Sequence, residues 1–352
     1  MHLLNNGMLF MLFISMFVFT SEEIQAQDKQ QYNIISVGFY NLENLFDTVD
    51  DTLIKDEEFL PEGARAWTIE KYNEKSANMA YVISQIGIEN VKSGLSVLGV
   101  SEVENRKVLE DLVAQPSLKD RNYQIIHYNS PDQRGVDVAF LYNPSHFTPI
   151  TSKPITTIVF DENGNRRKTR DILYVKGLIE TDTFHFLVNH WPSRGGGPVT
   201  VTQRNNAAKQ CRMVFDSIRQ LTPLAKVVIM GDLNDDPTSE SIKSYLRTVS
   251  KIKDVKKTGL FGPFEDFYRR GQGSNAFRDA WSLFDQIIIS EGLTDNSMPG
   301  YYYFKANIFN KQFLRQPTGQ YKGYPFRTFS GDEYQGGYSD HFPTYLYLVK
   351  PL

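Results

Sequence analysis

Apolar runs rich in β-branched and aromatic residues alternate along the chain with polar segments, and they predict strands. The runs occupy residues 32–40, 95–100, 123–127, 136–142, 155–160, 173–179, 184–189, 226–230, 284–289 and 344–349. Some neighbouring runs are close enough to be joined as hairpins. The pattern therefore predicts a protein with many strands.

Between these runs, apolar residues recur at spacings of three and four, which predicts amphipathic helices. One stripe extends from Ile69 to Ile86, a short one covers 108–112, and a third covers about 203–220. A fourth, short helix is expected after Ser239, whose side chain is a suitable N-cap. Helices interleaved with strands favour an α/β (α+β) architecture with mixed sheets inside and helices outside.

The N-terminal segment does not fit this pattern. Residues 8–20 form an apolar run too short to span a bilayer comfortably, and a small residue, Ala26, follows. We interpret residues 1–26 as a signal peptide, which predicts a secreted or periplasmic protein without an integral membrane segment after cleavage. An uncleaved membrane anchor is the alternative. No linker or repeat divides the remainder, so residues 27–352 are expected to form a single domain.

Composition narrows the possible partners. The formal net charge is −3, and loss of Glu22 and Glu23 with the leader leaves about −1. A near-neutral chain needs a local basic patch to bind a polyanion. Arg170 and Arg194 are the best candidates for substrate binding, because guanidinium groups match phosphate geometry and both lie near strand ends. The run 166–170 is equally well explained as a solvated hairpin tip.

The single cysteine, Cys211, excludes an intrachain disulfide. Its spacing from Ala207, Val214 and Ile218 places it on the apolar face of a helix. A packed, unreactive thiol is expected there.

Polar residues follow or open the buried strands at six places. Asp232 and Asn234 are two positions apart after the run 227–230, so their side chains can share one face. Taken singly, each of these residues also has an ordinary explanation, such as a turn Asn, a surface Glu or a structural His. The full set is Asn41, Glu102, His190, Asp232 with Asn234, Asp285, and Asp340 with His341.

An aspartate at the start of an apolar strand is costly without a partner. Asp285 is such a residue, and His341 is an obvious cationic partner, because a carboxylate fixes the tautomer of an imidazole and raises its basicity. Carboxylates, amides and imidazoles together meet the needs of phosphodiester hydrolysis, where a water loses a proton and charge develops on phosphate oxygens.

Two segments carry a resemblance to a known family: Gly231-Asp232-Leu233-Asn234 and Ser339-Asp340-His341. Together with residues 40–47, 101–105 and 189–194, they resemble an exported bacterial branch of the endonuclease/exonuclease/phosphatase superfamily. The resemblance spans about 41–343. It implies a four-layer αββα sandwich, in which two mixed sheets face each other and helices lie outside.

The resemblance also implies a role for each residue. Glu102 would be the primary ligand of Mg²⁺ (or Mn²⁺), with Asp340 and Asn41 completing the metal site. Asp232 would act as base or water-orienting acceptor, Asn234 would contact the scissile phosphate, and His341, held by Asp285, would stabilise developing charge. His190 would touch the phosphate or leaving group, and Asp137 is one candidate for orienting it.

The resulting expectation is a secreted Mg²⁺- or Mn²⁺-dependent phosphodiesterase, a nuclease acting on DNA or RNA, which is a monomer without a stable protein partner. One alternative is hydrolysis of lipid or small phosphoesters, for which the aromatic run 301–304 could contact a membrane. The other is a non-catalytic binding protein with a degenerate site. Retention of Asp232, Asn234, Asp340 and His341 argues against degeneration.

Overall fold

Two six-stranded mixed sheets organise the chain between Tyr32 and Leu352. The computed structural model describes residues 30–352, so the signal peptide expected at 1–26 lies outside the described residues. The first sheet has the strand order β15-β18-β1-β2-β4-β3, and the second has β11-β14-β10-β9-β8-β5.

The strands of the first sheet are β1 (Tyr32–Leu45), β2 (Val97–Val103), β3 (Gln124–His127), β4 (Asp137–Tyr142), β15 (Tyr302–Ile308) and β18 (Thr344–Pro351). Those of the second are β5 (Thr148–Ile155), β8 (Ile172–Ile179), β9 (Asp182–His190), β10 (Lys226–Asp232), β11 (Leu260–Phe261) and β14 (Asp285–Ser290). Three small hairpins are formed by β6 (Val159–Phe160) with β7 (Arg166–Arg167), β12 (Asn275–Phe277) with β13 (Ala280–Ser282), and β16 (Phe329–Ser330) with β17 (Glu333–Tyr334).

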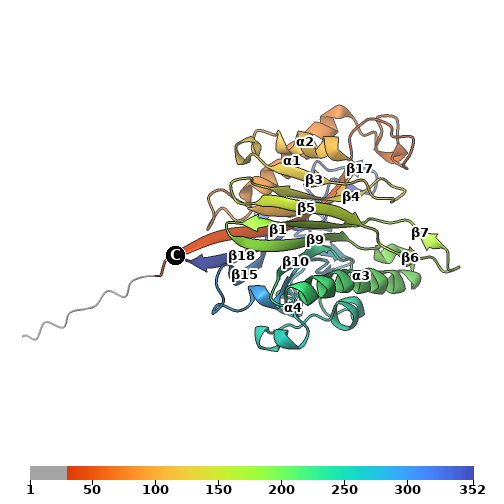
Figure 1. Ribbon diagram of the computed structural model, residues 1–352. Coiled ribbons are helices and arrows are strands. Elements are labelled where there is room, and N and C mark those ends of the chain that lie inside the picture. Colours follow the sequence, from red (N-terminus) through yellow and green to blue (C-terminus); the bar gives the residue numbers. More distant parts are fainter. Residues whose placement is uncertain (1–29) are drawn as a thin grey trace, which may run out of the picture. The chain divides into compact units, whose positions relative to one another are not determined.

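Helices cover the outer faces of both sheets (Figure 1). They are α1 (Ile69–Gln85), α2 (Arg106–Val113), α3 (Val199–Leu221) and a π-helical segment, Ser241–Leu246. The short α4 (Glu265–Arg269) packs instead, through Phe267 and Tyr268, against the cluster between the sheets. The π-helical segment stands where the fourth helix was expected, but the Ser239 side chain does not cap it.

Apolar side chains pack in three layers, which confirms the expected αββα sandwich. The inner faces of the two sheets meet in a buried cluster that includes Phe39, Phe140, Phe186 and Met230. A second cluster lies between the first sheet and helices α1 and α2, and a third joins the second sheet to α3. Cys211 lies in the third cluster, fully buried, as expected of a packing residue, and burial raises the pKa of its thiol to about 12.

Two strand predictions need correction. The run 155–160 is not one strand, because β5 ends at Ile155 and only Val159–Phe160 pair again, in a small hairpin. Sequence reasoning missed β5 because Pro149 and Pro154 interrupt it, which only an edge strand tolerates.

The aromatic run 301–304 belongs to an ordinary sheet. Tyr301 is buried, and β15 begins at Tyr302 and pairs with β18. Phe304 alone is well exposed, at a shift in the strand register between Tyr303 and Lys305. The run therefore does not form a projecting membrane-contact hairpin. Among residues 30–352, no helix has both the length and the apolar character needed to cross a bilayer.

Acidification is expected to destabilise the second sheet through His185 on β9. Burial lowers the pKa of His185 to about 4, with a contribution from Lys176, and its Nδ1 lies 2.8 Å from the Tyr174 hydroxyl. In the unfolded chain, His185 takes up a proton near pH 6.5, whereas in the folded protein it stays neutral until the pH approaches 4. The stability that depends on a neutral His185 is therefore fully present above pH 6.5 and is lost as the pH falls towards 4. At pH 5 the loss should be about 2 kcal/mol.

Urea unfolding of the wild type and of His185→Gln, each at pH 7.5 and pH 5, measures this effect. The variant should lose less stability than the wild type on acidification. Equal losses in the two proteins would show that protonation of His185 does not cause the loss of stability on acidification.

Candidate active site

The strand register brings the predicted polar residues to one end of the two sheets. In the second sheet, Asp232 pairs with His190 on the parallel strand β9 and with Asp285 on the antiparallel strand β14. In the first sheet, Asn41 pairs with Ser101, one residue before Glu102, on the parallel strand β2. Because β1 and β10 pack against each other across the core, these strand ends adjoin.

The backbone at this end is irregular. The register of β1 with β2 shifts between Asn41 and Leu45, and that of β2 with β4 shifts between Ser101 and Val103. Four residues here that are not glycine have positive φ angles: Glu43 (48°), Asn44 (54°), Glu102 (59°) and Asn234 (50°). Such bulges and left-handed residues cost energy and cluster at functional sites, where they direct particular side chains.

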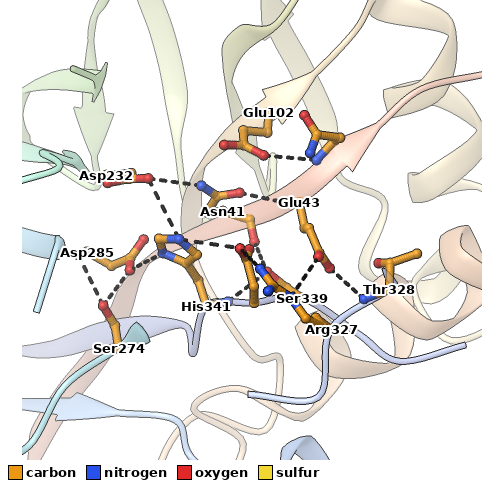
Figure 2. Close-up of polar contacts among 12 residues, drawn as sticks. Asn41, Glu43, Glu102, Asp232, Ser274, Asp285, Arg327, Thr328, Ser339 and His341 are labelled. Atoms are coloured by element: carbon orange, nitrogen blue, oxygen red, sulfur yellow. Dashed lines mark hydrogen bonds and ion pairs between the residues drawn. The ribbon is translucent and has the colours of Figure 1, made fainter. Parts of the chain in front are cut away.

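Asp232 is the centre of the polar cluster (Figure 2). Its carboxylate accepts hydrogen bonds from the Asn41 side-chain amide (3.0 Å) and from the Asn234 backbone N–H (2.9 Å). His341 Nε2 lies 4.0 Å away. Burial, followed by the neighbouring negative charges of Asp285 and Glu102, raises the pKa of Asp232 to about 7, against the effect of His341. A carboxyl group with such a pKa is matched to proton transfer near neutral pH.

The expected pair of Asp285 and His341 is formed. His341 Nδ1 is 2.6 Å from Asp285 Oδ2, and the Ser274 hydroxyl donates to the same oxygen. Asp285 is fully buried. Burial alone would lower the pKa of His341, but the charges of Asp285, Asp340 and Asp232 raise it well above its ordinary value. The imidazole is therefore held as a cation whose Nε2 side faces the cluster.

His190 differs in charge from His341. Its Nε2 lies 3.6 Å from Glu102 Oε1 and 3.7 Å from Asp232 Oδ2, while its buried Nδ1 has no hydrogen-bond partner among the described residues. Burial, with the nearby charges of Arg170 and Arg134, keeps its pKa well below the ordinary value, so the ring is neutral. Asp137 does not orient it, because that carboxylate contacts His127 and the Ser130 N–H instead.

Asp340 borders the cluster from the segment before β18. Its Oδ1 is 3.8 Å from His341 Nε2, and its Oδ2 accepts a hydrogen bond of 2.6 Å from Arg327. Burial raises the pKa of Asp340, but the charges of His341 and Arg327 outweigh it and leave the pKa below the ordinary value. Asp340 is therefore ionised.

Sequence reasoning missed a network of charges behind Asp340. Arg327 Nε is 3.6 Å from Glu43, which also accepts a hydrogen bond from the Thr328 N–H. Burial and the charge of Asp340 raise the pKa of Glu43 to about 7. The fully buried Lys75 on α1 donates to Thr328 and compensates these acids. Glu43 belongs to the motif at 40–47, but nothing in the sequence connects it with Lys75 or Arg327.

Three residues that were predicted to contact the substrate make contacts within the protein: Arg170, Arg194 and Asn234. Arg170 is buried and donates to the backbone carbonyls of His190 and Trp191 and to Asp132, so it braces the end of β9 instead of meeting substrate. Arg194 is partly exposed and binds the Asn234 carbonyl, Asp235 and Asp236.

The Asn234 side chain donates to the Trp191 carbonyl, so it also helps to hold the loop after β9. The loops that carry His190 and Asp232 are thus tied together by hydrogen bonds. The structure gives these three residues a supporting role that motif spacing alone did not reveal.

The donor set at this site fits a hard divalent cation. Glu102, Asp340, Asp232 and Asn41 offer oxygen atoms, and Mg²⁺ and Mn²⁺ prefer such ligands. Glu102 Oε2 accepts a hydrogen bond from the Asn44 N–H. Glu102 also forms, with His190 and Asp232, a group of side chains close enough together to hold a metal ion. Of the sequence-predicted ligands, Glu102 and Asn41 adjoin Asp232 directly, whereas Asp340 reaches the cluster through His341.

A comparison with family models matches residues 36–350 to the Endonuclease/Exonuclease/phosphatase family. No curated protein matches the chain. The match covers nearly all of the described chain and includes every residue of the site.

Solved structures show the same fold at low sequence identity. One is an endonuclease/exonuclease/phosphatase family protein from Bacteroides thetaiotaomicron, with 16% identity, a TM-score of 0.53, and coverage of 92% of this chain and 100% of that one. A humanized TDP2 from D. rerio has 14% identity and a TM-score of 0.54, with 90% and 98% covered. A mannosyl-6-phosphatase from B. thetaiotaomicron has 16% identity and a TM-score of 0.52, with 90% and 99% covered.

Proposed function

The chain belongs to the endonuclease/exonuclease/phosphatase family of metal-dependent phosphoric ester hydrolases, and we propose that it cleaves phosphodiester bonds of DNA or RNA. The observation that supports hydrolysis most directly is the cluster around Asp232. A carboxyl group with a pKa near neutrality lies beside a neutral His190 and a cationic His341.

Most residues of this cluster have a chemical task in the proposed reaction. Asp232 orients the attacking water and accepts its proton, with Asn41 and the Asn234 N–H fixing the carboxylate. Cationic His341, held by Asp285, donates to a non-bridging phosphate oxygen. Glu102, Asp340 and Asn41 would hold a divalent cation, which would neutralise the charge that develops on the phosphate.

A polyanionic substrate is supported by arginines around the site. Arg327 borders two cavities that both reach Asp340, and Arg278 and Arg65 each line one of them. Arg65 and Arg327 are paired with carboxylates, whereas Arg278 has no carboxylate partner among residues 30–352, so Arg278 is the guanidinium most available to a phosphate.

Plasmid DNA, single-stranded DNA and RNA should be cleaved with Mg²⁺ or Mn²⁺ and remain intact with excess chelator. His341→Ala should lose this activity, whereas Asp295→Asn, a change in an exposed loop, should keep it. The nuclease proposal would be rejected if nucleic acids stayed uncut under every metal condition.

The second candidate is hydrolysis of small phosphoesters. It is favoured by the cavity of about 340 Å³ beside Asp340, and a mannosyl-6-phosphatase shares the fold. A lipid substrate has less support, since the run 301–304 is part of a sheet. Testing sugar phosphates and sphingomyelin vesicles in the same assay distinguishes small phosphoesters and lipids from nucleic acids as substrates.

Export and a monomeric state are part of the proposal. The apolar leader at 8–20 supports export, and N-terminal sequencing of exported protein should begin at Gln27. Light scattering of the mature protein should give the mass of one chain. Retention of the leader at the membrane would instead support an uncleaved anchor.

A further inference from the structure

A cavity of about 340 Å³ opens beside Asp340, outside the catalytic cluster. Its walls come from the β12–β13 hairpin, from the segment between β15 and β16, and from residues in and just after the β16–β17 hairpin. Arg327 and Asp340 form the side shared with the catalytic cluster. A group bound here is therefore adjacent to a phosphate bound at the cation site.

Aromatic rings form part of the wall. Phe277 is 69% exposed and Tyr321 is 48% exposed, although both are large hydrophobic residues. Tyr324 is fixed by a hydrogen bond to Asp279 and lies 5.7 Å from Tyr321, centroid to centroid. Exposed rings on a rigid support are suited to stacking against a planar base.

Polar groups in the same wall lack partners. The side-chain amides of Gln316, Gln320 and Gln335 make no hydrogen bond to any residue within 30–352. Arg278 has no carboxylate partner within that range, and its guanidinium lies 5.0 Å from the Phe277 ring centroid. Amide side chains pair with base edges, and a free guanidinium suits a phosphate.

The hairpin that carries these groups is tied to the catalytic cluster. Ser274, immediately before β12, donates to Asp285, the carboxylate that holds His341 (Figure 2). At the hairpin turn, Arg278 (φ 49°) and Asp279 (φ 62°) both adopt left-handed conformations, which Asn-Gly or Asp-Gly usually supply. Arg278 lines the cavity from this turn, so the turn places a cation in the cavity wall.

We propose that this cavity is a nucleoside pocket, which binds the base and sugar of one nucleotide attached to the phosphate that is cut. The inference rests on the proposed function and names the part of the substrate that is recognised. The volume lies at the lower end of ligand pockets, so it fits one nucleoside unit and not a duplex. The base stacks against Tyr321 or Phe277, and Arg278 binds the next phosphate along the strand.

Two small diesters with the same leaving group test the pocket: thymidine 5′-(4-nitrophenyl phosphate) and methyl 4-nitrophenyl phosphate. We measure kcat/KM for both with Mn²⁺, using the mature wild type, Tyr321→Ala and Phe277→Ala. The wild type should prefer the thymidine ester by about tenfold or more, and each variant should lower that ratio about five- to tenfold, as expected for loss of one stacking contact.

Phe304→Ala is the matched control, because Phe304 is exposed on β15 and does not line the cavity. It should leave the ratio unchanged. Equal turnover of the two esters by the wild type, or unchanged ratios in both pocket variants, would overturn the nucleoside pocket. Failure to cleave either ester with Mg²⁺ or Mn²⁺ would instead contradict the proposed function.

A binding measurement separates a nucleoside from a sugar. Thymidine monophosphate should raise the melting temperature of the wild type, and Tyr321→Ala should reduce that increase. Mannose 6-phosphate should have little effect. A larger increase with the sugar phosphate, which Tyr321→Ala also reduces, would assign the pocket to carbohydrates and reject the inference.

Discussion

Replacing Asp232 with asparagine is expected to lower kcat/KM for phosphodiester cleavage about 10³-fold, the typical contribution of a positioned general base. Asparagine has nearly the same shape and keeps an oxygen that can accept from Asn41 or the Asn234 N–H. The variant loses the ability to take a proton, the negative charge near the cation and one of these two hydrogen bonds, because each carboxylate oxygen of Asp232 accepts one of them. Rates with a diester substrate at saturating Mn²⁺ measure the effect.

Stability distinguishes this loss from misfolding. Asp232 is 2% exposed, and a buried carboxylate among other acids costs folding energy. Asp232→Asn should therefore melt at the same temperature as the wild type or higher. Asp295→Asn, the same change in an exposed loop, should alter neither rate nor melting temperature. An Asp232→Asn protein with more than a tenth of wild-type activity would exclude Asp232 as the base.

Replacing Asp285 with asparagine should lower kcat about 10³-fold with little change in KM. Asp285 does not meet substrate; it is a positioning residue that fixes the His341 ring through a 2.6 Å contact and favours its cationic form. Loss of an equivalent carboxylate in other His–Asp pairs has effects of at least this size.

A double-mutant cycle with His341→Gln tests that role. If Asp285 acts only through His341, the double variant should be no slower than the slower single variant, because the second change removes nothing further. If the double variant instead lost activity by the product of the two single losses, Asp285 would have a function separate from His341. Each protein should give the same near-ultraviolet circular dichroism as the wild type, which excludes a general loss of packing.

Much of this site could be predicted because its residues stand at the ends of apolar strands. The run 227–230 predicts a buried strand, and the register of parallel neighbours then places Asp232 beside His190. The pair of Asp285 and His341 follows from the cost of burying an unpaired charge. Periodicity and cost of burial are local properties, so they can be recognised in the sequence without an alignment.

The parts that were missed depend on contacts between distant segments. Lys75 lies on α1 and meets Thr328, 253 positions away, and no local pattern marks a buried lysine in an amphipathic helix. Arg170 was expected at the substrate because it is basic and near a strand. Its actual partners are the Asp132 carboxylate, 38 positions away, and two backbone carbonyls, and neither kind of contact carries a local sequence signal.

The ion pair between Arg327 and Asp340 has a consequence for handling the protein. The Arg327 guanidinium already neutralises the charge of Asp340, one of the acids that would bind a metal. Lys75 offsets the charge of Glu43, which lies behind Asp340. Electrostatic repulsion among these carboxylates is thus relieved by the polypeptide itself. Chelation should leave a folded but silent enzyme, to which Mg²⁺ or Mn²⁺ can be returned without refolding.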